Sequence, residues 1–241
     1  GMTRERFLDE IEPYILEELA KGTPLHAMVK HILGLYTGCP GARKFRRVLS
    51  EEAVLPGAGI EVLHKARDIL EETAVKVAEY QQAVELINNA KRPIIFAGHG
   101  VMLSGAMDLM REFAERADIP IAMTLLGIGS VPASHPLNLG MMGMHGEAWV
   151  NQAIQEADLL LAFGMRFDDR VTGNVKTYAP NARKIHIDID PAEFNKNVIV
   201  DVALAGDLSH VLRDLLPKIE RGDRSGWLAT IAEVKGDSAV R

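Results

Sequence analysis

The stretch DLLLAFGMRFDDRVTG, residues 158–173, decides the fold class of this 241-residue chain. Its apolar run LLLAF indicates a buried β-strand, because the run is short and Gly164 follows it at once. Arg166, Arg170 and two adjacent aspartates come directly after the run. So much charge at the end of a buried strand predicts either a ligand site or a set of ion pairs that fixes a loop.

Short apolar runs of the same kind recur from about residue 78 onward. They are PIIFAG (93–98), IPIAMT (119–124), KIHIDID (184–190) and DVALAGD (201–207). Between the first two, apolar residues follow a helical spacing at Ala106, Leu109, Met110, Phe113, Ala114 and Ala117. Strands that alternate with helices predict an α/β domain over residues 77–241, with a doubly wound, mostly parallel sheet covered on both faces.

The first part of the chain, residues 1–76, contains no run that reads as a strand. Its apolar residues follow a helical period, and breaks rich in Gly and Pro at 22–24, 38–41 and 56–59 divide it into four helices. We expect a small all-α helical bundle there, joined to the second domain by a helix near residues 60–90.

The composition is that of an ordinary globular protein, with 47% hydrophobic residues, 25% charged residues and a net charge of −6. No apolar run approaches the ~20 residues of a membrane-spanning helix, and the segment GMTRERFLDE is charged. We therefore expect a cytoplasmic protein with no membrane partner. Cys39 is the only cysteine and the histidines are scattered, so we expect no disulfide and no metal site.

The strand ends of the second domain carry residues suited to a ligand, and parallel sheets of this kind bind ligands at the carboxyl ends of their strands. Glycines occur at 98–100, where backbone can approach a ligand closely. Arg166 and Arg170 are suited to bind phosphate oxygens as planar forks. Asp188 and Asp207 are suited to accept hydrogen bonds from ribose or adenine. Together they predict a site for a dinucleotide, with the arginines at its pyrophosphate.

A structural alternative stays open for each of these features. Arg166, Asp168, Asp169 and Arg170 would form ion pairs that fix a surface loop. Glycines at strand ends are common turn residues. The sequence MMGMHG, residues 141–146, would fill irregular gaps in the core, since methionine is adaptable.

Longer motifs between about residues 78 and 232 resemble the middle domain of acetolactate synthase (acetohydroxyacid synthase), a family that depends on thiamine diphosphate. The similar stretches, in order, are AKRPIIFAGHGV, TLLGIGSVPASHPLNLGMMGMHG, ADLLLAFGMRFDDRVTG and KIHIDIDPAEFNKN. The resemblance implies a Rossmann-like domain that holds FAD, which that family does not consume in its acyl-transfer reaction. The FAD contacts that it implies are Gly98, His99, Gly100, Thr124, Leu125, Met142, Gly143, Met144, His145, Gly164, Arg166, Asp168, Arg170, Asp188, Ile189, Asp207 and Leu208. His99 departs from the family, where many members have glycine.

The same resemblance implies limits on the activity of this chain. The family needs a glutamate on a preceding domain to activate thiamine, and a Gly-Asp-Gly motif that leads to a magnesium and diphosphate site; this chain has no Gly-Asp-Gly. We expect no catalytic residue, no bound thiamine diphosphate or magnesium, and weak FAD binding, because the family holds FAD between domains.

The preferred function is a nucleotide- or FAD-binding module without catalysis. The alternative is a component of an acetolactate synthase, which condenses pyruvate in branched-chain amino acid biosynthesis, with thiamine-binding domains on other chains. Exposed methionines at 141–144 predict a homodimer.

The front segment, residues 4–70, resembles a different family, the C-terminal helical domain of a tRNA-dihydrouridine synthase of the DusA type. The most specific part is KHILGLYTGCPGARKFRRVLS, residues 30–50. The resemblance implies tRNA binding, and candidate RNA contacts are Lys30, Arg43, Lys44, Arg46 and Arg47, within an interval that lacks acids. We expect only weak tRNA binding and no DNA binding, because residues 1–73 hold ten basic against twelve acidic residues. A solvated basic helix is the alternative.

The chain thus resembles parts of two different enzymes within one reading frame. This suggests the hypothesis of a gene fusion, an assembly artefact or a chimera.

Overall fold

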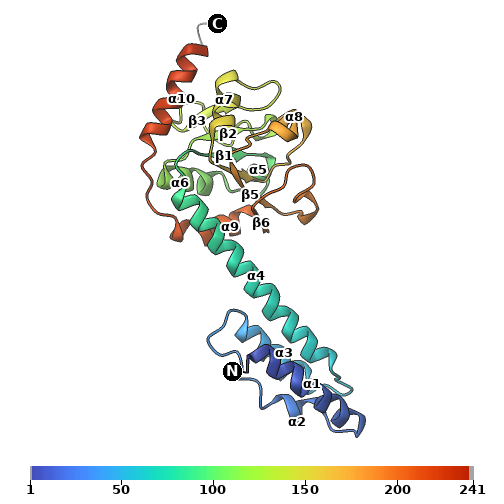
Figure 1. Cartoon of the computed structure of the whole chain (residues 1–241). Coiled ribbons are helices and arrows are strands. Elements are labelled where there is room, and N and C mark those ends of the chain that lie inside the picture. The colour runs from blue at the N-terminus through green and yellow to red at the C-terminus, as the bar shows by residue number, and fades with distance from the viewer. Residues whose placement is uncertain (1, 239–241) are drawn as a thin grey trace. The chain divides into compact units, whose positions relative to one another are not determined.

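The computed structural model describes residues 2–238 of the chain, and Figure 1 labels most of its helices and strands. The chain divides into two compact units, residues 1–78 and 79–241. One long helix, α4 (Glu61–Asn89), contributes residues to both units. Within the described residues, no helix is both long enough and apolar enough to cross a membrane.

The first unit is built from helices, as the sequence predicts. They are α1 (Arg4–Ala20), α2 (Leu25–Val29), α3 (Ala42–Glu52) and the first part of α4. Helix α1 begins after Thr3, whose hydroxyl accepts a hydrogen bond from the backbone N–H of Arg6 at 3.2 Å. The apolar faces of the helices meet in a core whose fully buried members include Leu8, Ile15, Leu25, Phe45, Leu49 and Leu63.

The second unit is an α/β domain, which confirms the predicted fold class. Its strands are β1 (Pro93–Ala97), β2 (Ile121–Met123), β3 (Asn138–Met141), β4 (Leu159–Phe163), β5 (Arg183–Asp188) and β6 (Val202–Ala205). They form one sheet in the order β3-β2-β1-β4-β5-β6, and all neighbouring strands are parallel. In this order the chain reverses its direction of winding between β1 and β4, and ligands bind at such a point in doubly wound sheets.

The two central strands, β1 and β4, are buried at every position. They pair in register, with Ile95 beside Leu161 and Ala97 beside Phe163. A parallel strand that is covered on both faces reads as an uninterrupted apolar run. This is why the sequence predicts five of the six strands. Strand β3 is missing from that prediction because its sequence, NLGM, is short, only partly buried and contains Asn and Gly.

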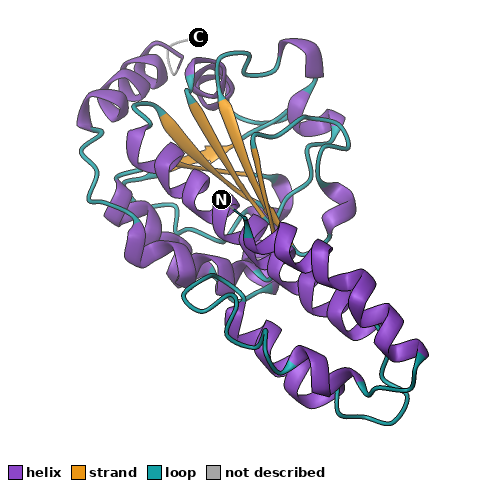
Figure 2. Cartoon of the chain, turned by 60° about the horizontal axis from the view of Figure 1, so that its bottom comes forward, coloured by secondary structure: helices purple, strands orange, loops and turns teal. Residues whose placement is uncertain are grey.

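Helices cover both faces of the sheet, as Figure 2 shows with the strands in orange. The last turns of α4, together with α6 (Met107–Ala117) and α9 (Leu208–Leu215), pack on one face. Helices α7 (Ala148–Glu156) and α10 (Ser225–Ser238) pack on the other, where the Trp227 indole donates to the Pro93 carbonyl at 3.1 Å. The connections hold short helices: α5 (His99–Leu103), α8 (Asp169–Thr172), η1 (Leu125–Gly127), η2 (Val175–Thr177), η3 (Pro191–Glu193) and η4 (Leu216–Lys218).

Candidate functional site

The chain segments that leave β1 and β4 touch each other at the point where the winding reverses. The backbone N–H of Gly100 donates to the Gly164 carbonyl at 2.9 Å. Gly164 has a φ of +57°, and a Cβ added to it would lie 2.6 Å from the Gly100 Cα. A Cβ on Gly98 would lie 2.2 Å from the Gly164 oxygen. From the sequence, these glycines were expected to let the backbone approach a ligand. In the structure, they allow the backbones of the two connecting segments to approach each other.

A pocket of 220 Å³ opens beside these glycines at the carboxyl ends of β1, β4, β5 and β6. Six predicted residues line it: Gly100, Gly164, Asp188, Ile189, Asp207 and Leu208. Four lining residues are absent from the prediction: Leu103, Ser104, Ile187 and Gly206. Leu103 and Ser104 lie three and four residues after Gly100, so the helical spacing of α5 was the signal that would have found them.

The two aspartates of the pocket each keep one carboxylate oxygen uncommitted. Asp188 accepts a hydrogen bond from the backbone N–H of Asp190 through Oδ1, at 3.0 Å. Asp207 caps α9, because its Oδ1 accepts from the backbone N–H of Ser209 at 2.9 Å and from the Ser209 hydroxyl at 2.6 Å. The hydrogen bond from the Ser209 side chain is the main reason why the pKa of Asp207 is lowered. Among the described residues, the Oδ2 atoms of both aspartates accept no hydrogen bond.

The loop after β4, residues 164–170, carries the two arginines and two aspartates that follow this buried strand. Arg166 and Arg170 are exposed, and neither forms an ion pair with any residue that the structure describes. Asp168 instead caps α8, accepting from the backbone N–H of Val171 at 3.2 Å. The ion pairs of the structural alternative are therefore not formed, and the two guanidinium groups are available to an anion.

The methionine-containing loop between β3 and α7 lies against this charged loop. The backbone N–H of Met144 donates to the Arg170 carbonyl at 2.8 Å. Asn151 on α7 fixes the loop from the other side, because its side chain both accepts from and donates to the Gly143 backbone at 2.9 Å. Met142 is buried and Met141 is half-buried, whereas Met144 and His145 are exposed. The expected exposure of the methionines is therefore correct for Met144 alone, and only part of the loop fills the core.

The remaining predicted residues lie at the same edge of the sheet. Thr124 begins η1, and its hydroxyl accepts from the backbone N–H of Gly127 at 3.1 Å. The neighbouring Leu125 is exposed by 69%, and His99, at the start of α5, is also exposed. The predicted positions therefore form two groups at one edge: those that line the pocket, and those that continue past the charged loop toward β2 and β3.

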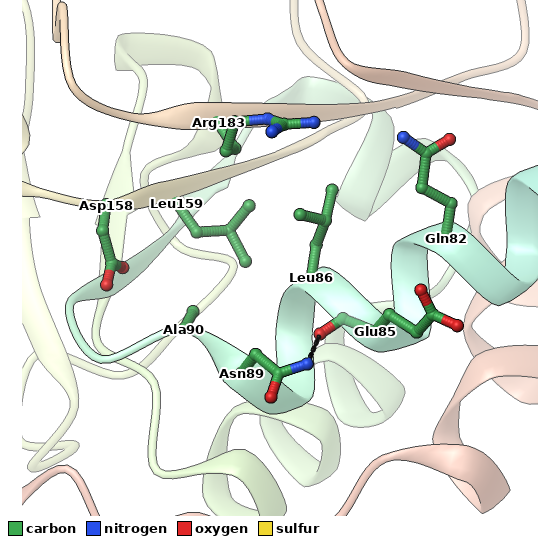
Figure 3. A pocket seen from close by; sticks show the side chains of 8 residues that line it. All are labelled: Gln82, Glu85, Leu86, Asn89, Ala90, Asp158, Leu159 and Arg183. Atoms are coloured by element: carbon green, nitrogen blue, oxygen red, sulfur yellow. Dashed lines mark hydrogen bonds between the residues drawn. The ribbon is translucent and has the colours of Figure 1, made fainter.

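A larger cavity, of 410 Å³, lies at the opposite edge of the sheet (Figure 3). Two of its three charged lining residues already have partners. The carboxylate of Asp158 accepts from the backbone N–H groups of Lys91 and Arg92 at 2.8 and 2.9 Å, and Arg183 pairs with Asp201 at 2.5 Å. Size therefore favours this cavity, whereas chemistry favours the smaller pocket at the carboxyl edge. The smaller pocket is the better candidate site, because doubly wound sheets bind ligands at the carboxyl ends of their strands. The described residues contain no cluster of side chains that would hold a metal ion.

Fold and site together define a doubly wound, Rossmann-like α/β domain with a pocket where its winding reverses. The chain belongs to a known family of such domains, because the model of the thiamine pyrophosphate enzyme central domain matches residues 80–215. The resemblance drawn from the motifs of the second unit is therefore confirmed at the level of the family. The match does not extend over the helical unit.

Acetolactate synthase large subunits are among the curated relatives of the chain. A probable large subunit from Methanocaldococcus jannaschii is 48% identical over 160 residues, which cover 65% of this chain and 27% of that protein. The large subunit from Corynebacterium glutamicum is 46% identical over 162 residues, covering 65% and 26%. The isozyme 1 large subunit from Escherichia coli is 44% identical over 155 residues, covering 64% and 27%. The matches thus span about a quarter of the length of these relatives and correspond to their middle domain.

Proposed function

We propose that residues 79–241 form a nucleotide-binding module of the acetolactate synthase type, whose ligand is FAD. The observation that carries the proposal is the pair of uncommitted guanidinium groups, Arg166 and Arg170, on the loop that leaves Gly164 at the pocket wall. Arginine without an acidic partner beside a pocket is well suited to a diphosphate.

The pocket fits one end of the cofactor. Its 220 Å³ is smaller than the roughly 300–1,000 Å³ of pockets that enclose a whole drug-sized ligand. Apolar walls from Leu103, Ile187 and Ile189, with the free oxygen of Asp188, suit an adenosine group. The pyrophosphate would then lie at Arg166 and Arg170, and the flavin ring would lie toward Leu125 and Met144.

FAD bound here would have a structural role, so the module itself would not catalyse a reaction. The exposed Leu125 and Met144 leave the flavin end open to water. We therefore expect the adenosine end to contribute most of the affinity, and the whole cofactor to bind weakly.

The test is a visible absorbance spectrum of the purified protein, followed by a titration with FAD. We expect saturable binding that weakens by at least about 100-fold when Arg166 and Arg170 are both replaced by alanine, since hydrogen bonds to charged groups contribute about 1.5–3 kcal/mol each. The matched control is Arg183→Ala at the opposite edge, which should change affinity less than about two-fold. Absence of binding, or equal effects of both replacements, would contradict the proposal.

A second candidate function is a component of an acetolactate synthase whose thiamine-binding domains lie on other chains. It is supported by large apolar side chains that are exposed at the same edge: Leu125, Leu126, Ile128 and Met144. Such a patch suits either another domain or a second copy of the chain, and we propose a homodimer when no other chain is present. Pyruvate consumption after mixing with candidate thiamine-binding chains tests the first, and analytical ultracentrifugation tests the second.

A third candidate function concerns the helical unit, for which we propose weak tRNA binding on the basis of its resemblance to dihydrouridine synthases. Among the candidate contacts, Lys30, Arg43 and Lys44 are exposed and have no ion pair among the described residues. Arg47 pairs with Glu51 at 3.2 Å, and Arg46 donates to the Leu33 carbonyl at 3.4 Å.

The test of this candidate is tRNA binding measured at several salt concentrations. We expect a salt dependence whose logarithmic slope falls by about two when Arg43 and Lys44 become alanine. Binding that does not change with salt or with these replacements would contradict the candidate and leave a solvated basic helix.

We also propose that two unrelated segments meet near residue 76. The family match begins at residue 80, and the compact units divide after residue 78. Sequencing intact genomic DNA across the codons for residues 70–80 tests whether the junction exists in the source. A continuous natural gene would exclude an assembly artefact.

A further inference from the structure

His186 is a fully buried histidine in the middle of β5, at the base of the charged loop. Its Nε2 lies 2.7 Å from the Met165 carbonyl oxygen. Because a carbonyl oxygen only accepts hydrogen bonds, Nε2 carries the proton. The ring is held edge-on between Phe167 and Phe194, with centroid distances of 5.3 and 5.1 Å. Among the described residues, the other ring nitrogen, Nδ1, has no partner.

A second side chain holds the same loop two residues further along. The Asn197 side-chain amide donates to the Phe167 carbonyl oxygen at 2.8 Å. The carbonyl groups on both sides of Arg166 are therefore bound by side chains from outside the loop. Met165 and Phe167 are both buried, and Arg166 between them is exposed, as expected of an extended backbone whose side chains alternate.

This arrangement matters because nothing else among the described residues holds Arg166. Its guanidinium has no ion pair, so the direction of its side chain depends on the backbone at residues 165–167. A long side chain reaches a phosphate with less loss of conformational entropy when its backbone is already fixed. His186 and Asn197 supply that fixation.

We propose that His186 and Asn197 are positioning residues for a diphosphate at Arg166, an inference that rests on the proposed nucleotide-binding function. His186 acts through its Nε2–H on the Met165 carbonyl, and Asn197 acts through its amide on the Phe167 carbonyl. His186 also lies on the same strand as Asp188, and its Nε2 is 3.9 Å from Oδ2 of that residue. Strand β5 thereby fixes the distance between Asp188, which lines the pocket, and His186, which binds the loop at residues 164–170.

The electrostatic state of the histidine is consistent with this role. Burial is the main reason why the pKa of His186 is lowered, so the ring is neutral at neutral pH. A neutral imidazole donates one hydrogen bond to the loop without adding a charge beside the phosphate site.

The test compares ADP, which carries the phosphates, with adenosine, which does not, by calorimetric titration of the full chain. His186→Leu removes the donor and should weaken ADP binding about ten-fold while changing adenosine affinity less than about two-fold. His186→Gln keeps an N–H donor and should recover ADP affinity to within about three-fold of the native protein. In the His186→Leu background, Arg166→Ala should have little further effect, because the two changes remove one interaction.

Two controls separate positioning from general stability. Tyr178→Phe alters a neighbouring aromatic ring that packs against Phe167, and Val150→Ala weakens the same core from helix α7. Both should leave the preference for ADP over adenosine unchanged. If His186→Leu weakens ADP and adenosine binding equally, or if Arg166→Ala keeps its full effect in that background, the positioning role is wrong.

Failure of the proposed function would appear differently, as absence of ADP binding to the native protein. Amide hydrogen exchange in the ligand-free protein then decides the inference on its own. His186→Leu should speed exchange at Val171 and Thr172, whose amides close the end of the loop, and Val150→Ala should not. Equal exchange in all three proteins would overturn the inference.

Discussion

The sheet has a carboxyl edge and an amino edge, where the strands end and begin, and the charged residues described at these two edges differ in whether they are paired. At the amino edge, Asp158 binds two backbone N–H groups and Arg183 pairs with Asp201. At the carboxyl edge, Arg166 and Arg170 have no ionic partner among the described residues. The amino edge has the larger cavity, 410 against 220 Å³.

The difference teaches that cavity size alone does not locate a ligand site. A charged side chain that is already paired stabilises the fold and is less available to bind a ligand. An unpaired charged side chain beside a pocket does not stabilise the fold in this way, but it is available to bind a ligand. Perturbations at the amino edge should therefore affect stability alone. Perturbations at the carboxyl edge should affect binding, and where backbone packs on backbone they should affect stability too.

The largest effect is expected at the contact between the two glycine-containing connections. Gly164→Ala adds a Cβ 2.6 Å from the Gly100 Cα, in a residue with positive φ, and should lower the free energy of unfolding by about 3 kcal/mol or more. Gly105→Ala is the matched control, because Gly105 has a similar φ of +64° and no atom within 4 Å of the new Cβ. Its cost should be about 1–2 kcal/mol. Urea denaturation measures both, and equal losses would show that the contact is not tight.

A smaller effect is expected at the amino edge. Asp158→Ala leaves the N–H groups of Lys91 and Arg92 without their acceptor and should lower the free energy of unfolding by about 1–2 kcal/mol. Asp158→Asn keeps one acceptor oxygen and should lose about half as much. Neither change should alter ADP affinity by more than about two-fold, as measured by calorimetry well below the unfolding temperature. A clear loss of affinity would place the ligand at this edge instead.

The smallest effect is a pH dependence that originates at His186. Burial lowers the pKa of His186 in the folded state, against the weaker opposing influence of its hydrogen bond to the Met165 backbone and of Asp188 and Glu193. The unfolded chain therefore binds a proton that the folded chain does not, and stability increases with pH through this range. The contribution should be complete above about pH 6.5, the ordinary histidine value, and should decrease as the pH falls below it. Denaturation curves at several pH values should show a weaker decrease for His186→Gln; an identical decrease would assign the effect to other groups.

The sequence predicted the parts of the fold that burial dictates. The runs around β1, β2, β4, β5 and β6 are apolar because both faces of the sheet are covered. Strand β3 escaped prediction because Asn138 and Gly140 interrupt any apolar pattern. For an edge strand of this kind, pairing to β2 fixes the conformation more than side-chain preference does.

The grouping of the candidate residues was predictable from the sequence, but their local roles were not. Strand ends at 98–100, 164–170 and 188 were expected to meet at one edge, and they do, since parallel strands bring their carboxyl ends together. Sequence spacing did not show that Asp168 and Asp207 cap helices. Nor did it show that His186 binds the Met165 carbonyl, a contact between residues that are 21 positions apart.

The central claim is that the carboxyl edge, not the amino edge, binds a nucleotide. The most direct test is to follow backbone amide signals by NMR while ADP is added to the full chain. We predict shifts concentrated at residues 98–104, 164–171, 187–190 and 206–209, with none at Gln82, Asp158 or Arg183. Shifts concentrated around the larger cavity at the amino edge, or no saturable shifts at all, would contradict the claim.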